Sequence, residues 1–267
     1  FKARVVYQAG DNPQDVEVGD VSGDGNVDLV VASEVPGLGV ADGSFAAGVS
    51  YTRTSAPKAT ELYDLNGDGN VDLITADPGS NGTMSVVSIS LGNSDGSFRA
   101  AISYNAGLDP QDVEVGDVTG DGNVDLVVSS KVSESISVIS ILQGNGNGTF
   151  KAKSTISALA GASEIELSDF DGDGNSDIAY ISADSDKVVV HLSNGDGTFQ
   201  AGVSYEVGEK PSDLLATDLS GDGKVDLAIT SSGDGKLTIL LGTGDGSFVS
   251  SSGGSGGDGS FQAFVTN

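Results

Sequence analysis

The chain has 267 residues, of which 37% are hydrophobic, 40 are Gly and none is Cys. Its 12 basic and 39 acidic residues give a formal net charge of −27, which excludes nucleic acid and anionic lipid as partners because both repel such a field. The lack of Cys excludes a disulfide framework and thiol chemistry, and no apolar run approaches the ~20 residues that insert across a membrane. Many short strands joined by Gly-rich turns fit this composition better than long helices do.

The first residues have the pattern of the end of a repeat. Tyr7 follows Phe1 by six residues, and later Phe–Tyr pairs with the same spacing come directly after a turn. We therefore expect residues 1–7 to form a fourth strand that completes the last repeat. Such a strand would tie the two ends of the chain together and leave few exposed sheet edges.

An acidic nine-residue segment recurs five times along the chain. Its copies begin at Asp20, Asp64, Asp117, Asp169 and Asp218, at intervals of 44, 53, 52 and 49 residues. This period is the length of a propeller blade and is far too long for a nonapeptide β-helix. The repeat predicts an all-β propeller of five blades, each with up to four antiparallel strands.

The third repeat shows the strands of one blade most fully. Residues 110–117 lead into the acidic segment, residues 125–129 leave it, and residues 135–142 alternate between apolar and polar side chains. Strict alternation over these lengths predicts strands with one buried face. An Asn-Gly or Asp-Gly turn before a Phe, here Phe150, then leads to the fourth strand, because these pairs accept the positive φ of tight turns.

The ends of the chain depart from the regular repeat. Residues 33–45 leave room for a loop but hardly for a third strand, so we expect a short first blade. We assign the propeller to residues 1–249, a flexible Gly/Ser tether to residues 250–257, and a spare strand to residues 258–267. That strand either closes the ring or pairs with a neighbouring molecule.

The acidic segments have the composition of calcium-binding loops. Every copy has Asp at positions 1, 5 and 9, Gly at positions 4 and 6, and an oxygen-bearing side chain at position 3. Calcium takes six to eight oxygen ligands at roughly 2.3–2.6 Å, which short acidic side chains on a tightly curled backbone can provide. Gly at position 6 permits the sharp bend. Position 7 would supply its backbone carbonyl, so Lys224 is tolerable there if its side chain points away.

The expected metal ligands are, in chain order, Asp20, Ser22, Asp24, Asn26, Asp28, Asp64, Asn66, Asp68, Asn70, Asp72, Asp117, Thr119, Asp121, Asn123, Asp125, Asp169, Asp171, Asp173, Asn175, Asp177, Asp218, Ser220, Asp222, Lys224 and Asp226. These loops hold 16 of the 39 acidic residues, and five divalent ions would change the formal charge from −27 to −17.

The composition also disfavours other metals. With no Cys and a single His, zinc, copper and iron are disfavoured. Magnesium rarely occupies such dedicated cages. An EF-hand is excluded because position 12 never holds Glu.

The loops and turns together resemble the FG-GAP or VCBS repeats of β-propellers, found in integrin α-chain heads and many bacterial exoproteins. The resemblance rests on five Asp-x-[Asp/Asn/Ser/Thr]-Gly-Asp-Gly-x-x-Asp loops and on the Gly-Asp-Gly-[Ser/Thr]-Phe turns, and it extends from Phe1 to about Phe248. It implies about five structural Ca²⁺ ions, one at the periphery of each blade. Members of the family usually have seven blades, so five loops imply a small ring or part of a longer one.

No catalytic constellation stands out in the sequence. The single His, His191, lies in an alternating run and is expected at a half-exposed strand position. The conspicuous carboxylates already have the spacing of metal ligands. Four tyrosines occupy equivalent repeat positions and are expected to be structural: Tyr7, Tyr51, Tyr104 and Tyr205. Tyr63 and Tyr180 are off that register and are candidates for a surface site.

We therefore expect an extracellular protein that is not an enzyme and that acts as a module for adhesion or recognition. Its partner would be a glycan or a cell-surface or matrix protein. Two alternatives stay open. One is a structural subunit of a surface layer or extracellular filament, which would self-associate through the C-terminal strand. The other is a catalytic or non-catalytic part of a secreted enzyme that degrades polysaccharides.

Overall fold

The computed structural model describes residues 11–35, 57–79 and 85–250. All regular secondary structure in these ranges is β-strand, arranged in five antiparallel sheets, which confirms the predicted all-β fold. The described part of the chain contains no helix that is long and apolar enough to span a membrane.

Four of the sheets have four strands, and two strands of the first sheet are described. The first sheet contains β1 (Asp11–Gly19) and β2 (Asp28–Val35). The second contains β3 (Ala59–Tyr63), β4 (Asp72–Asp77), β5 (Val86–Ser90) and β6 (Ile102–Tyr104). The third contains β7 (Pro110–Gly116), β8 (Asp125–Ser133), β9 (Ile136–Leu142) and β10 (Ser154–Ala158). The fourth contains β11 (Ala162–Ser168), β12 (Asp177–Ser182), β13 (Lys187–His191) and β14 (Val203–Glu206). The fifth contains β15 (Pro211–Thr217), β16 (Asp226–Ser231), β17 (Lys236–Gly242) and β18 (Phe248–Ser250).

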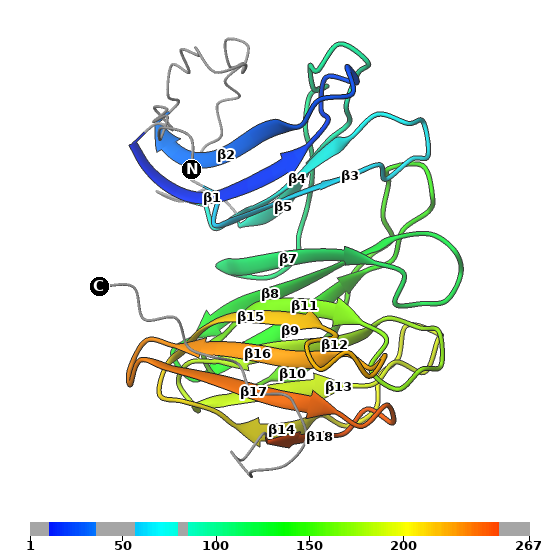
Figure 1. Ribbon diagram of the computed structural model, residues 1–267. Helices are drawn as coiled ribbons and strands as arrows, with labels where there is room; N and C mark the ends of the chain where they lie inside the picture. The colour runs from blue at the N-terminus through cyan, green and yellow to red at the C-terminus, as the bar shows by residue number, and fades with distance from the viewer. Residues whose placement is uncertain (1–10, 36–56, 80–84, 251–267) are drawn as a thin grey trace, which may run out of the picture.

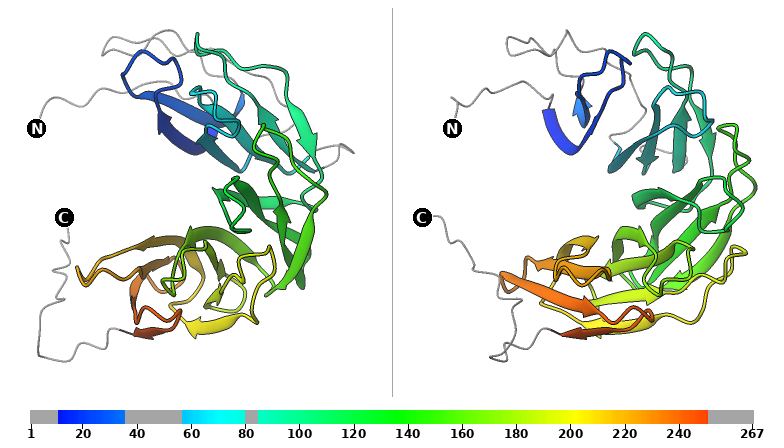
Figure 2. Two further views of the ribbon diagram at one scale, coloured as in Figure 1. Left: turned by 90° about the vertical axis from the view of Figure 1, so that its right-hand side faces the viewer. Right: turned by 45° about the vertical axis from the view of Figure 1, so that its right-hand side comes forward.

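The sheets follow one another as the blades of a propeller do (Figure 1). Each sheet is a simple meander, and its first strand contacts the first strand of the next sheet: β1 lies against β3, β3 against β7, β7 against β11, and β11 against β15. We call these five first strands the inner strands. The five sheets form an arc that is open between the sheet of β1 and the sheet of β15 (Figure 2).

The hydrophobic core is divided into layers between consecutive sheets. One layer joins the second and third sheets through side chains such as Ile74 and Leu126, and the next joins the third and fourth through Ile139 and Ile178. A further layer, which includes Leu227, joins the fourth and fifth sheets. Burying a β-branched or leucine side chain contributes roughly 1.5–3 kcal/mol. Because each layer is shared by two sheets, the stability of a blade depends on its neighbours.

The repeated Phe and Tyr side chains connect neighbouring sheets. Tyr104 at the end of β6 packs edge-on against Phe150 of the third sheet, with ring centroids 5.6 Å apart, and its hydroxyl oxygen accepts the Phe150 N–H at 3.3 Å. Tyr205 of β14 makes the same contacts with Phe248 of the fifth sheet, at 5.6 Å and 3.1 Å. The structural role expected for these two tyrosines follows from this arrangement, whereas Tyr7 and Tyr51 lie outside the described residues.

Two sequence-based expectations about side-chain exposure are wrong. His191 is buried, with 8% of its surface exposed, because its ring stacks on Tyr180 and its Nδ1 lies 3.0 Å from the Gln200 carbonyl oxygen. Tyr180 is only 2% exposed, and its hydroxyl oxygen accepts the Leu159 N–H at 3.1 Å, so it offers no surface site. The other candidate, Tyr63, is 44% exposed.

The expectations for the chain ends concern residues that mostly lie outside the described ranges. These are the closing strand at residues 1–7, most of the short first blade, the tether and the strand at residues 258–267. The fourth position of the last sheet is held by β18, which directly follows the turn before Phe248.

The Tyr–Phe contact provides a test of how blades are joined. We expect Tyr205→Phe to lower the free energy of unfolding by about 1 kcal/mol, because the buried Phe248 N–H loses its acceptor. Tyr63→Phe, which changes an exposed ring in the same way, should leave stability unchanged. The midpoint of urea unfolding measures both, and equal midpoints for the two variants would show that the contact does not stabilise the packed sheets.

Candidate metal centres

Each acidic loop joins the inner strand of a sheet to the second strand of the same sheet. The inner strands run in the same direction, so the loops gather on one side of the arc, on the right in Figure 1. The structure therefore places one loop in each sheet, as the repeat predicts.

The two glycines of every loop have a backbone conformation that other residues rarely adopt. At positions 4 and 6 the φ angles lie between 67° and 90° in all five loops. A side chain at these positions would strain the backbone. The sequence pattern Gly-Asp-Gly is thus the local cause of the tight curl.

The carboxylate at position 1 is wrapped by the backbone of its own loop. In the second loop, Asp64 accepts the N–H of Asp68 at 3.2 Å and the N–H of Gly69 at 2.8 Å. The first Asp of each other loop accepts the two equivalent N–H groups, at 2.7–3.3 Å. The loop is therefore preformed around this carboxylate by the protein's own hydrogen bonds.

The carboxylate at position 9 connects the loop to the interior of the sheet. Asp72 is fully buried; it accepts the Leu65 N–H inside the loop at 2.9 Å and the Gly92 N–H beyond β5 at 2.8 Å. Its equivalents in the third to fifth loops, Asp125, Asp177 and Asp226, make the same pair of bonds. In the first loop, Asp28 is half-buried and accepts the Ser22 N–H at 2.9 Å.

Burial alters the acidity of these position-9 carboxyl groups. Desolvation raises the pKa of Asp72 and Asp125, and it raises the pKa of Asp177 to about 6, against the opposing effect of the backbone N–H donors.

The end of the third strand lies very close to the loop. A Cβ at Gly92 would collide with the carbonyl oxygen of Val71. A glycine there allows the N–H to reach the buried carboxylate.

The loops also contact the following sheet. In the third loop, the carbonyl oxygen of Val118 accepts the Ser193 hydroxyl of the fourth sheet at 3.0 Å. In the fourth loop, the carbonyl oxygen of Phe170 accepts the Gly246 N–H from the last turn at 3.1 Å. A ligand that rigidifies a loop therefore also acts on the interface between two blades.

The fourth loop has the densest set of carboxylates. Single carboxylate oxygens of Asp169, Asp171 and Asp177 lie within 4.8 Å of one another. Each ionised carboxylate has about four lone-pair sites, so the backbone bonds leave acceptor capacity on all three. An all-oxygen, anionic set on a curled backbone fits a hard cation such as Ca²⁺, for which Asp169, Asp171, Asp173 and Asp177 would be side-chain ligands.

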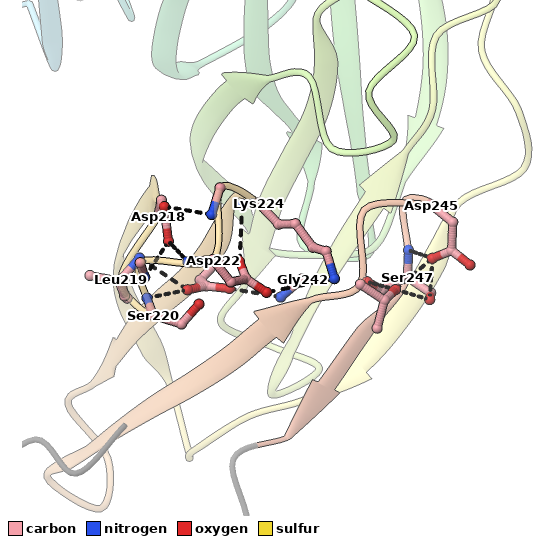
Figure 3. Close-up of polar contacts among 12 residues, drawn as sticks. Asp218, Leu219, Ser220, Asp222, Lys224, Gly242, Asp245 and Ser247 are labelled. Atoms are coloured by element: carbon pink, nitrogen blue, oxygen red, sulfur yellow. Dashed lines mark hydrogen bonds and ion pairs between the residues drawn. The ribbon is translucent and has the colours of Figure 1, made fainter. Parts of the chain in front are cut away.

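Side chains at position 7 fold back onto position 5. Asn70, Asn123 and Asn175 each donate a side-chain N–H to the Asp at position 5, at 2.7–2.9 Å. In the fifth loop, the Lys224 ammonium lies 3.6 Å from Asp222 (Figure 3). The expectation that Lys224 points away from the loop is therefore wrong, because its charge is attracted to the carboxylate. This ammonium would compete with a metal ion for Asp222.

Sequence reasoning missed a second set of acidic residues on the inner strands. Glu17, Glu61, Glu114 and Glu166 each stand three residues before the first Asp of a loop, and Asp15, Asp112, Glu164 and Asp213 stand two residues earlier. Asp15 accepts the Thr60 N–H at 2.7 Å and Asp112 accepts the Ile165 N–H at 2.7 Å, so both connect neighbouring sheets. Their constant spacing from the first Asp of each loop was the sequence signal that could have identified them.

The buried position-9 carboxylate can be tested without a metal. In a chelator, we expect Asp177→Asn to lower the free energy of unfolding by about 1–3 kcal/mol, because one of two buried N–H groups then faces an amide NH₂. The matched control is Asp173→Asn in the same loop, whose exposed carboxylate makes only local bonds and whose loss should leave the unfolding midpoint unchanged. Equal midpoints for both variants would contradict the anchoring role of Asp177.

Comparison with known proteins relates these repeats to a family. A family profile described as an FG-GAP-like repeat matches residues 64–128 and 169–229. Each matched stretch starts at the first Asp of one loop and ends just beyond the next, so the two stretches contain the second to fifth loops. No curated protein matches the sequence.

Two solved structures share the fold. A protein from Lactobacillus plantarum is similar with a TM-score of 0.55 and 14% identity, over 84% of this chain and 61% of that one. The biofilm matrix protein Bap1 of V. cholerae is similar with a TM-score of 0.52 and 18% identity, over 90% of this chain and 39% of that one. This chain thus spans less than two thirds of either structure. The chain therefore contains FG-GAP-like repeats, and its described sheets are antiparallel, propeller-type blades with one acidic loop in each.

Proposed function

We propose that the chain is an extracellular, calcium-stabilised module for adhesion or recognition, with no catalytic activity of its own. The observation that carries the calcium assignment is the cluster of Asp169, Asp171 and Asp177 oxygens within 4.8 Å of one another, on a loop whose geometry recurs in all five sheets. Calcium binds such a folded loop far better than the unfolded chain, so it stabilises the blades in proportion to its activity.

The extracellular setting follows from the same chemistry. Loops that rely on three or four carboxylates are strongly self-repelling without a cation, and the calcium level outside cells is high enough to fill weak sites. The likeness to Bap1, described as a biofilm matrix protein, agrees with this setting. The partner in this proposal is a glycan or a cell-surface or matrix protein.

A second candidate is a structural subunit that assembles with further copies of the chain. It is favoured by apolar side chains exposed at both ends of the arc, which include Val16 and Val18 on β1 and Leu237 on β17. Equivalent positions in the middle sheets are fully buried: Val113 packs in the layer shared with the preceding sheet, and Val188 packs in the layer shared with the following sheet. Sedimentation with and without calcium separates the two candidates, because only the subunit forms large assemblies.

Removal of calcium provides the first test. We expect a chelator to lower the melting temperature and excess Ca²⁺ to restore it, because the ion binds only the folded loops. Mg²⁺ at the same concentration should restore it less, since it holds its waters and prefers octahedral sites. A melting temperature that is the same in Ca²⁺ and in chelator would overturn the calcium assignment.

The five loops should differ in affinity. Asp171→Ser gives the fourth loop the position-3 residue of the first and fifth loops and should weaken its calcium binding. Lys224→Asn gives the fifth loop the residue found in the other four and should strengthen binding there by removing the competing ammonium. Isothermal titration of both variants and the wild type measures these opposite shifts, and unchanged isotherms would show that these side chains do not act on a bound ion.

Adhesion is tested with the calcium-loaded protein on glycan arrays and on immobilised matrix proteins. The proposal expects binding that a chelator abolishes and that the Asp177→Asn variant weakens. If the protein binds calcium but no array partner, and instead sediments as large assemblies, the structural-subunit candidate replaces the adhesion module.

A further inference from the structure

The eight inner carboxylates, defined above as two sets on β1, β3, β7, β11 and β15, lie close together although they are far apart in sequence. Each inner strand contacts the next, and together these strands line the inside of the arc (Figure 2). In β1, β7, β11 and β15 the strand register shifts in the stretch that holds Asp15, Asp112, Glu164 and Asp213. Such bulges redirect side chains. The four bulges lie at equivalent positions of their inner strands.

The charges that face these carboxylates from the adjacent strands are all negative in the described part of the chain. Glu61 interacts with Glu17, Asp15, Asp112 and Glu166. Glu114 interacts with Glu61, Asp112 and Glu166, and Glu164 with Asp15, Asp112, Glu166 and Asp213. The lysine just before β3, Lys58, is paired with Asp109 at 2.9 Å. The lysine just before β15, Lys210, is not among the groups that act on these glutamates.

Burial therefore raises the pKa of these glutamates, and none of the neighbouring charges named above is a cation that would offset this effect. Desolvation first, and the neighbouring carboxylates second, raise the pKa of Glu61 and Glu164 to about 8 and that of Glu114 to about 10. The pKa of Glu166 rises to about 7, although the Ala216 N–H opposes the shift. A glutamate in the unfolded chain ionises near 4.5, so the folded arc keeps protons that the unfolded chain has lost.

We propose that Glu61, Glu114, Glu164 and Glu166 are a proton-dependent device that holds neighbouring blades together in their neutral form and loosens them as they ionise. The blades meet along the inner strands, so repulsion among these groups acts directly on the contacts between sheets. None of the four glutamates is nearer than three residues to a loop ligand. The device is thus separate from the calcium sites and does not depend on them.

The direction of the pH effect follows from proton linkage. Between the unfolded value near 4.5 and the folded values near 7 to 10, the folded protein binds more protons than the unfolded chain does. Stability falls with rising pH wherever the folded state binds more protons. The contribution of these glutamates is therefore fully present below about pH 4.5 and is lost as pH rises through their folded pKa values of about 7 to 10.

The test compares the wild type with the triple variant Glu61→Gln/Glu114→Gln/Glu166→Gln, which keeps the shape but cannot ionise. Melting temperatures are measured from pH 5 to pH 9 in a chelator, so that no loop holds a metal ion. We expect the wild type to lose roughly 10 °C across this range and the triple variant to lose much less. As a matched control, Glu134→Gln/Glu206→Gln neutralises two exposed glutamates and should keep the wild-type slope.

A flat or rising wild-type profile overturns the proposal, and so does a triple variant with the wild-type slope. If the triple variant does not fold, the single variant Glu114→Gln takes its place, with a smaller slope than the wild type expected. Infrared spectroscopy of the wild type at pH 7 adds a readout that is independent of stability. It should detect protonated carboxyl groups that disappear on unfolding, and their absence from the folded protein would also overturn the proposal.

Discussion

The structure depends on the buried aspartate at the ninth position of each acidic loop. In four sheets this carboxylate lies in the interior and accepts one N–H from its loop and one from beyond the third strand of the sheet. Burying a charge is costly unless it is well hydrogen-bonded, so the loop and the strand must both reach it. The same contact holds the loop in the conformation in which its other carboxylates converge.

Acidic groups are concentrated in two places that differ in how their charge is neutralised. The loops are open to solvent at Asp68 and Asp173, and their carboxylates converge as cation ligands do. The inner carboxylates face one another across strand contacts, where burial favours the neutral form. A net charge of −27 is therefore compatible with a packed fold if cations act on one set and protons on the other.

The sequence alone was sufficient to predict the repeated β-blades and the position of each acidic loop, because both recur with a fixed spacing. It indicated a structural role for Tyr104 and Tyr205, but not their contacts with Phe150 and Phe248. It was insufficient for side chains whose surroundings come from other strands. His191 and Tyr180 are buried by each other across β12 and β13, and Lys224 turns to Asp222. The inner glutamates were assigned no role from the sequence, since only the contacts between sheets bring them together.

The most direct test of this account is the number of calcium ions bound by the folded chain. Equilibrium dialysis followed by elemental analysis counts them without reference to stability. The account predicts close to five Ca²⁺ per chain, one for each acidic loop. It also predicts that the fifth loop empties first as calcium is lowered, because the Lys224 ammonium competes for Asp222. A folded chain that binds no calcium even at a saturating calcium concentration would contradict this account.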